Sequence, residues 1–178
     1  MKAVVIDTNV ILVAKGRSEQ AWSECVSSCR ERLNQIIEGA EKIIIDDNRA
    51  ILGEYIDYLE DDNLTTDERI NGHFLEWFIR NYTNTEQCVQ VTITPIQDGR
   101  GFEEFPDDPE LSDFDPDDRK FIAVAVAYEN KHQQKSPILQ AVDSQWYGFR
   151  ELFVQNGLIV EFVCEENIRY LYERRQEN

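Results

Sequence analysis

Acidic side chains follow two apolar runs of this sequence at the points where the chain turns. Asp7 comes directly after Ala3–Ile6, and Asp143 comes directly after residues 138–142. If both runs are parallel strands of one sheet, their carboxyl ends meet at one edge, and the two carboxylates emerge there together. Carboxylates held close together repel, and a divalent cation removes the repulsion. The pair therefore predicts a site for a divalent cation, although each Asp alone would also serve as an ordinary helix cap.

Two further acids have different helical settings. Asp118 precedes the apolar stretch FIAVAVAY, and at about 100° per residue it shares a helical stripe with Ile122 and Ala125. Because that stripe must face the core, Asp118 is predicted to point inward at the helix start. Glu54 lies off the centre of the apolar stripe of its own helix, so periodicity alone predicts a solvated glutamate.

The elements that must position these acids alternate along the chain. Short apolar runs predict strands at residues 3–6, 42–45, 89–93, 137–142 and 158–163. Helical patterns occupy residues 21–39, about 46–60, about 66–82, a segment opened by Pro116, residues 144–155 and the polar chain end. This alternation predicts an α/β fold, a three-layer α/β/α arrangement with a central, mainly parallel sheet of about five strands. Residues 1–178 are expected to form a single domain, with an acidic loop at about 95–116.

The composition limits the function classes. The net charge of −17 opposes simple nucleic-acid binding through basic residues and favours cations or a basic partner protein. Most of the acidic loop is expected to be solvated. No apolar run is long enough for a membrane span, and a cytoplasmic protein is expected. The four cysteines lack metal-binding spacing, so reduced, packed thiols are expected and zinc is disfavoured.

Four motifs in order resemble the PIN-domain family. They are V-I-D-T-N-V at the first strand, R-A-I-L-G-E-Y in the second helix, D-x-x-F-I-A-V-A in the buried helix and A-V-D-S after the fourth strand. By this resemblance the acidic site comprises Asp7, Glu54, Asp118 and Asp143, with Thr8, Asn9 and Ser144 in support. Gln145 departs from the pattern, because many members carry a second acid two residues after the last Asp.

The resemblance implies an activity and partners. It implies a metal-dependent endoribonuclease that hydrolyses phosphodiester bonds of single-stranded RNA, with Mg²⁺ or Mn²⁺ as cofactor. It also implies a candidate role as the toxin of a toxin–antitoxin pair, with an antitoxin-type protein partner and a homodimer. The acidic loop and the long first helical region exceed the compact toxin-like members, which leaves the toxin role open.

Substrate contacts are less specific. The candidate phosphate contacts are cations beside the first and third motifs, namely Lys15, Arg17, Arg119 and Lys120. Each has the alternative reading of an ordinary surface cation. Trp146 and Tyr147 could stack on a base, but core anchors of their helix are the favoured interpretation.

Two other functions remain open. A non-catalytic PIN-like interaction module would be expected to lack some of the carboxylates, and here all the positions are filled. A phosphatase with Asp7 as its nucleophile would want a second Asp two residues later, where this chain has Asn9. A dinucleotide-binding protein is disfavoured, because no glycine-rich turn follows the first strand.

Overall fold

A parallel sheet forms the centre of the computed structural model, which describes residues 2–57, 73–96 and 101–177. Its five strands have the order β3-β2-β1-β4-β5, and every neighbouring pair is parallel. The strands are β1 (Ala3–Ile6), β2 (Lys42–Asp46), β3 (Cys88–Val91), β4 (Pro137–Gln140) and β5 (Ile159–Phe162). At the centre, Val5 pairs with Ile138 and Ile6 with Leu139.

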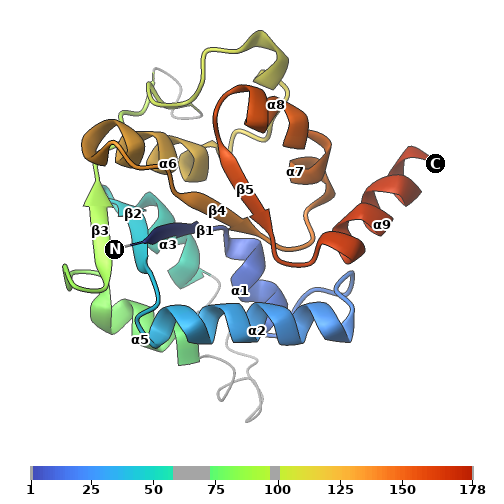
Figure 1. The fold of residues 1–178 in the computed structure, drawn as a ribbon, viewed down its shortest axis with the longest axis horizontal. Coiled ribbons are helices and arrows are strands. Elements are labelled where there is room, and N and C mark those ends of the chain that lie inside the picture. The colour runs from blue at the N-terminus through green and yellow to red at the C-terminus, as the bar shows by residue number, and fades with distance from the viewer. Residues whose placement is uncertain (1, 58–72, 97–100, 178) are drawn as a thin grey trace.

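Helices cover both faces of this sheet. They are α1 (Thr8–Ala14), α2 (Ser23–Ile37), α3 (Ala50–Asp57), α5 (His73–Asn81), α6 (Arg119–His132), α7 (Ser144–Gly148), α8 (Arg150–Gln155) and α9 (Glu165–Gln176). In Figure 1, α6 lies above the strands, while α2 and α5 lie below them. The expected three-layer α/β/α fold with five parallel strands is therefore confirmed.

The core follows from the apolar runs. β1 is buried along its whole length, as is the Ile43–Ile45 centre of β2, because a sheet with helices on both faces leaves its inner strands no side in water. α6 was expected to be buried because it is apolar nearly all round, and Phe121 and Ile122 are fully buried. Each such side chain contributes about 1.5–3 kcal/mol relative to an exposed one.

Several element boundaries differ from the expectation. The predicted helix from residue 144 to 155 is two helices, which meet at Phe149. Pro116 does not open α6: the backbone turns from Asp115 to Asp118, and α6 begins at Arg119 with Asp118 as its N-cap. α1 was not expected at all. The predicted helix at 66–82 is described only from His73 to Asn81, and its earlier part lies outside the described residues.

The start of α2 also differs from the expectation. Trp22 lies within the predicted helix of residues 21–39, where we expect an inner-facing residue, but it precedes the helix as its N-cap and is 41% exposed. Cys25 and Cys29 face the core together with Leu33 and Ile36. The helix starts two residues later than the pattern suggested, and the small cysteines lie on its buried face.

The described part of the acidic loop is anchored by aromatic packing. Phe114 is fully buried and makes edge-to-face contacts with Trp146, Phe149 and Phe153. Phe105 also stacks against Phe114. The acids of this loop were expected to be solvated, and this aromatic anchor holds their backbone against α7 and α8. Among the described residues, no helix has the length and apolarity needed to cross a membrane.

Candidate metal centre at the sheet edge

The first and last acids of the predicted site lie where the strand order reverses. From β1 the chain builds outward to β2 and β3 and then returns to β4 on the other side of β1. Such a reversal is the usual ligand site of an open α/β sheet. The backbone N–H of Asp7 donates to the Leu139 carbonyl at 3.1 Å, and the Val142 N–H donates to Oδ1 of Asn9 at 2.8 Å. Asn9 therefore fixes the start of α1 against the chain that leads to Asp143.

Asp7 is the most buried acid of this group, with 4% of its surface exposed. Its Oδ1 accepts a hydrogen bond from the backbone N–H of Asn9 at 2.7 Å, which caps α1. Burial raises the pKa of Asp7 well above its ordinary value, and the charges of Asp118, Glu54 and Asp143 raise it further. The Asn9 hydrogen bond opposes this shift without cancelling it. All four predicted acids therefore act on one electrostatic region.

Asp118 joins the region from the start of α6. The indole Nε1–H of Trp146 donates to its Oδ2 at 3.0 Å. Burial raises the pKa of Asp118 to about 6, and the charges of Asp143 and Asp115 add to the increase. The Trp146 hydrogen bond and the Lys120 ammonium lower the same pKa. Asp118 is thus ionised at neutral pH, at an energetic cost.

Asp143 caps α7, and its Oδ1 accepts from the backbone N–H of Gln145 at 2.8 Å. Burial raises its pKa, and the charge of Asp115 adds to the rise. Backbone hydrogen bonds from Gln145 and Trp146 and the charge of Arg175 lower it. The cap and the site acid are therefore one side chain, so the two interpretations of Asp143 are compatible.

Glu54 approaches the group from α3 and is held by two partners. Thr8 donates its hydroxyl to Oε1, and the Lys120 ammonium pairs with Oε2. The Glu54 side chain is 25% exposed and that of Lys120 is 11% exposed. Periodicity alone predicted a solvated glutamate; instead, Glu54 lies in an ion pair at the rim of the acidic region.

Lys120 also differs from the expectation of a phosphate contact or an ordinary surface cation. Its ammonium donates to the Asp117 carbonyl and lies 4.8 Å from the centroid of the Phe121 ring. An internal cation thus offsets part of the acidic charge. Removing one partner of such a partly buried pair leaves the other charge without compensation, which is costly.

The carboxylate oxygens suit a hard divalent cation, but the distances between them limit how many can bind one ion. Carboxylate oxygens are the ligands that Mg²⁺ and Mn²⁺ prefer. Within the described ranges, no three acidic side chains offer oxygens that all lie within 4.8 Å of one another. Mg²⁺ is commonly held by one or two carboxylates and several waters. The side chains therefore fit an ion held by two carboxylates better than a cage of three or four.

The other predicted residues have varied placements. Thr8 is buried against Glu54, whereas the Ser144 hydroxyl accepts from Arg175 of α9 at 3.4 Å. The Arg119 guanidinium donates to the carbonyls of Ser112 and Phe114, so it braces the acidic loop. Lys15 is only 4% exposed, and Arg17 is half-buried in the turn after α1. Trp146 and Tyr147 are buried, as expected of core anchors.

One acid was missed by the sequence interpretation. Asp115 belongs to the acidic loop, most of which was expected to be solvated, yet its charge raises the pKa of both Asp118 and Asp143. Its backbone N–H donates to Oε1 of Gln145 at 3.3 Å. Gln145 lies two residues after Asp143. Here its amide holds the backbone of Asp115, which brings an acid from the loop to that side of the site.

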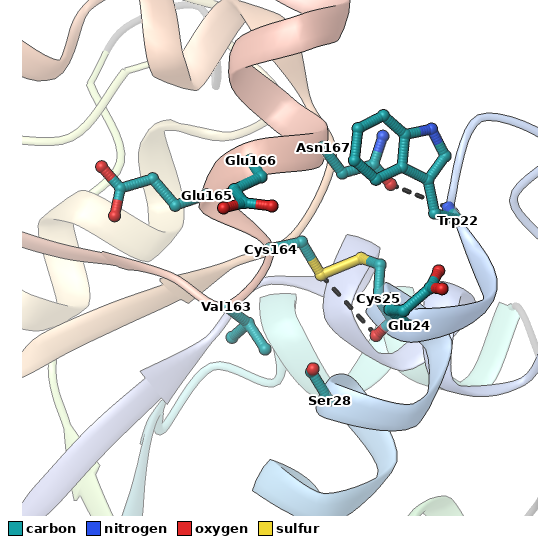
Figure 2. Close-up of a pocket in the computed structure, with 9 residues that line it drawn as sticks. All are labelled: Trp22, Glu24, Cys25, Ser28, Val163, Cys164, Glu165, Glu166 and Asn167. Carbon is teal, nitrogen blue, oxygen red and sulfur yellow. Dashed lines mark hydrogen bonds between the residues drawn. A yellow bond between two sulfur atoms is a disulfide. The ribbon is translucent and has the colours of Figure 1, made fainter.

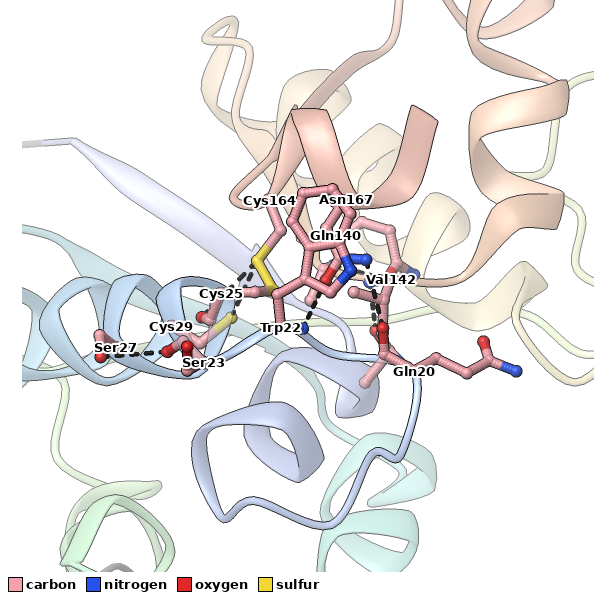
Figure 3. Close-up of a disulfide and its surroundings, with 12 residues drawn as sticks. Gln20, Trp22, Ser23, Cys25, Ser27, Cys29, Gln140, Val142, Cys164 and Asn167 are labelled. Atoms are coloured by element: carbon pink, nitrogen blue, oxygen red, sulfur yellow. Dashed lines mark hydrogen bonds between the residues drawn. A yellow bond between two sulfur atoms is a disulfide. The ribbon is translucent and has the colours of Figure 1, made fainter. Parts of the chain in front are cut away.

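The cysteines correct a second expectation. Cys25 of α2 and Cys164, the residue before α9, form a disulfide across a sequence separation of 139, so these two thiols are not reduced (Figure 3). Cys29 and Cys88 are free and buried. Burial raises the pKa of each free thiol to about 12, so both are protonated at neutral pH.

The sheet edge thus brings together acids from four parts of the chain, opposed by Lys120 and Arg175. Its charge balance and its place in the topology are the features that a functional assignment must explain. Comparison of the chain with protein-family models, with curated proteins and with solved structures finds no match.

Proposed function

We propose that this protein is a metal-dependent endoribonuclease that uses Mg²⁺ or Mn²⁺ to hydrolyse phosphodiester bonds in single-stranded RNA. One observation carries the proposal. At the point where the strand order reverses, burial and the charges of neighbouring acids raise the pKa values of Asp7, Asp118 and Asp143. Acids held together at an energetic cost are typical of functional sites rather than of structural caps. The choice of RNA rests on the resemblance of the four motifs to PIN domains.

Asp7 and Asp143 are the best-positioned cation ligands. Each carboxylate has one oxygen fixed by the first turn of its own helix, which sets its direction. Asp118 lies beside them and is oriented by the Trp146 indole. A bound divalent ion would lower the pKa of a water ligand and shield the charge of the phosphodiester.

Glu54 has a different role in this proposal. Its carboxylate is held in place by Lys120 and Thr8, and it is more exposed than Asp7. A carboxylate in this setting can accept a proton from an attacking water. Lys120 is then a positioning residue, because it acts through Glu54 and not on the substrate.

The excess of acidic residues would weaken RNA binding. With a net charge of −17, the chain repels phosphates, and Arg119 is engaged in bracing the loop. RNA affinity should therefore be weak and should depend on divalent cations at the site. A homodimer and a basic antitoxin-type partner, both implied by the resemblance, are parts of the proposal that would add positive charge.

The decisive experiment follows end-labelled single-stranded RNA incubated with purified full-length protein and Mn²⁺ or Mg²⁺. Cleavage is expected with metal, none with EDTA, and a loss of at least about 100-fold for Asp7→Asn and Asp143→Asn, as for the removal of other essential catalytic groups. Asp113→Asn is the matched control, because Asp113 is an exposed acid of the neighbouring loop. Cleavage that persists in EDTA or in Asp7→Asn would sink the proposal.

One observation favours a second candidate, a non-catalytic protein-interaction module. The Lys120–Glu54 pair places a cation inside the acidic group, and among the described residues no three carboxylates lie close enough together to share one ion. A module of this kind would bind neither Mn²⁺ nor RNA under conditions that preserve the fold. Calorimetric titration with Mn²⁺ separates the two candidates. A nuclease should bind Mn²⁺, and Asp7→Asn should weaken that binding, whereas the interaction module should not bind the ion.

A further inference from the structure

Three sulfur atoms gather on the side of the molecule where α2 meets the start of α9. The Sγ atoms of Cys25, Cys29 and Cys164 all lie within 4.8 Å of one another. The thiol of Cys29 is 3.7 Å from Sγ of Cys164, which is already bonded to Cys25 (Figure 3). Within the described parts of the chain, this is the one set of three metal-binding side chains so close together.

A disulfide uses two cysteines, so the third sulfur requires its own explanation. Cys25 and Cys29 are one helical turn apart on the buried face of α2, and Cys164 reaches them from the end of β5. In a tetrahedral site with Zn–S bonds of about 2.3 Å, neighbouring sulfurs lie about 3.8 Å apart. The separation of 3.7 Å between Cys29 and Cys164 matches that spacing.

Two helix ends favour thiolate ligands at this cluster, against the burial that raises the pKa of Cys29 to about 12. Cys25 lies in the first turn of α2, and Cys164 is the N-cap of α9. The positive ends of both helices therefore point toward the cluster, and this lowers the cost of negative charge on sulfur. Cys29 is completely buried and Cys25 nearly so, which would shield a bound ion from competing ligands.

A surface pocket gives access to the cluster (Figure 2). Cys25 and Cys164 line it together with Trp22, Glu24, Ser28, Val163, Glu165, Glu166 and Asn167. A fourth ligand, such as water, would approach the ion from the pocket side, where Cys25 and Cys164 lie. The carboxylates that line the pocket would attract a cation toward it.

We propose that, when the Cys25–Cys164 disulfide is reduced, the three cysteines bind one Zn²⁺ ion. Reduction by a phosphine converts the disulfide and one water into two thiols and a phosphine oxide. Binding of Zn²⁺ then releases three thiol protons to solvent and leaves three thiolates on the ion, with water as the fourth ligand. The disulfide and the zinc site are mutually exclusive, because both use the sulfurs of Cys25 and Cys164.

The zinc site would do the same structural work as the disulfide. Either one ties α2 to the start of α9, across a sequence separation of 139. The disulfide would then connect α2 to the start of α9 under oxidising conditions. The zinc ion would connect them under reducing conditions.

The test uses the full chain, reduced with a phosphine, freed of reductant under anaerobic conditions and titrated with Cd²⁺ as a probe. The ultraviolet absorption of cadmium–thiolate bonds should saturate at one ion per chain, and Zn²⁺ should displace it. Cys29→Ser should bind at least about 100-fold more weakly, because a three-sulfur site loses a ligand. Cys88→Ser is the matched control, since Cys88 is a buried cysteine on β3, outside the cluster.

Each outcome bears on the proposal. Equal Cd²⁺ affinity in Cys29→Ser and the wild type would overturn it. So would a reduced wild-type protein whose cadmium–thiolate absorption does not saturate at one ion per chain. If the reduced protein is unfolded, one equivalent of Zn²⁺ should restore its circular dichroism spectrum in Cys88→Ser but not in Cys29→Ser; failure to do so in Cys88→Ser also overturns it. Asp7→Asn should leave the cadmium signal unchanged, which separates this site from the acidic one.

Discussion

The acidic edge of the sheet and the sulfur cluster between α2 and α9 hold metal-binding atoms of opposite chemical character. The first gathers hard oxygen atoms whose charges repel, and the second gathers soft sulfur atoms, two of which are joined by a covalent bond. Asp7 and Asp143 follow strands that the topology places side by side, whereas Cys164 reaches α2 from the far end of the chain.

The difference teaches how one fold separates function from stability. At the acidic edge, burial and like charges raise the pKa values of Asp7 and Asp118, so this region lowers the stability of the folded state at neutral pH. At the sulfur cluster, the disulfide restricts the unfolded chain and raises stability. The contrast can be tested from both sides.

The largest expected effect is on the sulfur side. In the oxidised protein without metal, Cys164→Ser should lower the free energy of unfolding by about 5 kcal/mol, the value of the chain-entropy model for a loop of this length. Urea denaturation measures it. Cys88→Ser, which changes a buried thiol outside the disulfide, reports the cost of the serine itself. A loss in Cys164→Ser no greater than in Cys88→Ser would show that the disulfide contributes nothing.

The acidic edge should respond in the opposite direction. Asp118→Asn should raise the free energy of unfolding by about 2–3 kcal/mol at pH 7.5 without metal, because the folded-state pKa of Asp118 is about 6 and the unfolded value about 4. With the pKa raised on folding, the Asp118 contribution is fully present below pH 4 and is lost as the pH rises through 6. The gain in the variant should therefore vanish by about pH 4. Thermal unfolding across this range measures it, and a destabilised Asp118→Asn at pH 7.5, with Asp113→Asn unchanged, would contradict it.

Binding of Mn²⁺ should depend on pH through the same group. As the pH falls below the Asp118 pKa of about 6, the site loses the negative charge beside the two proposed ligands, so its affinity for Mn²⁺ should fall. Calorimetric titration at several pH values gives the slope. In Asp118→Asn the dependence between pH 5 and 6 should be weaker, and an unchanged slope would assign the titration to another carboxylate.

The smallest expected effect concerns the internal cation. Lys120→Met removes the positive charge beside Glu54 and Asp118 and should strengthen Mn²⁺ binding about three- to fivefold, since a repulsive charge near the ion is lost. Lys131→Met, at the other end of α6, is the control. Weaker binding in Lys120→Met would mean that Lys120 is needed to hold Glu54 in a ligating position.

The sequence predicted the sheet well because each strand is a short apolar run bounded by polar turns. The convergence of Asp7 and Asp143 followed from one rule, that parallel strands present their carboxyl ends at a common edge. The inward direction of Asp118 followed from helical phase, although its hydrogen bond to Trp146 did not. These predictions needed only local pattern and topology.

The remaining features depend on contacts between distant parts of the chain. Glu54 is drawn inward by Lys120, which lies 66 positions further along the sequence, and helical periodicity carries no information about such a partner. Asp115 reaches the site because Gln145 holds its backbone. The disulfide needed the packing of α2 against the start of α9, which spacing between cysteines does not reveal. Motif resemblance retained Glu54 where periodicity would have discarded it.

The Cys25–Cys164 bond turns most of this chain into a closed covalent ring. A protease that cuts once anywhere between those two residues opens the ring but releases no fragment. On a non-reducing gel the nicked protein would keep the mass of the intact chain, and two pieces would separate only after reduction. A single cut between Cys25 and Cys164 that separates Asp7 from Asp143 along the chain would thus leave both acids in one molecule.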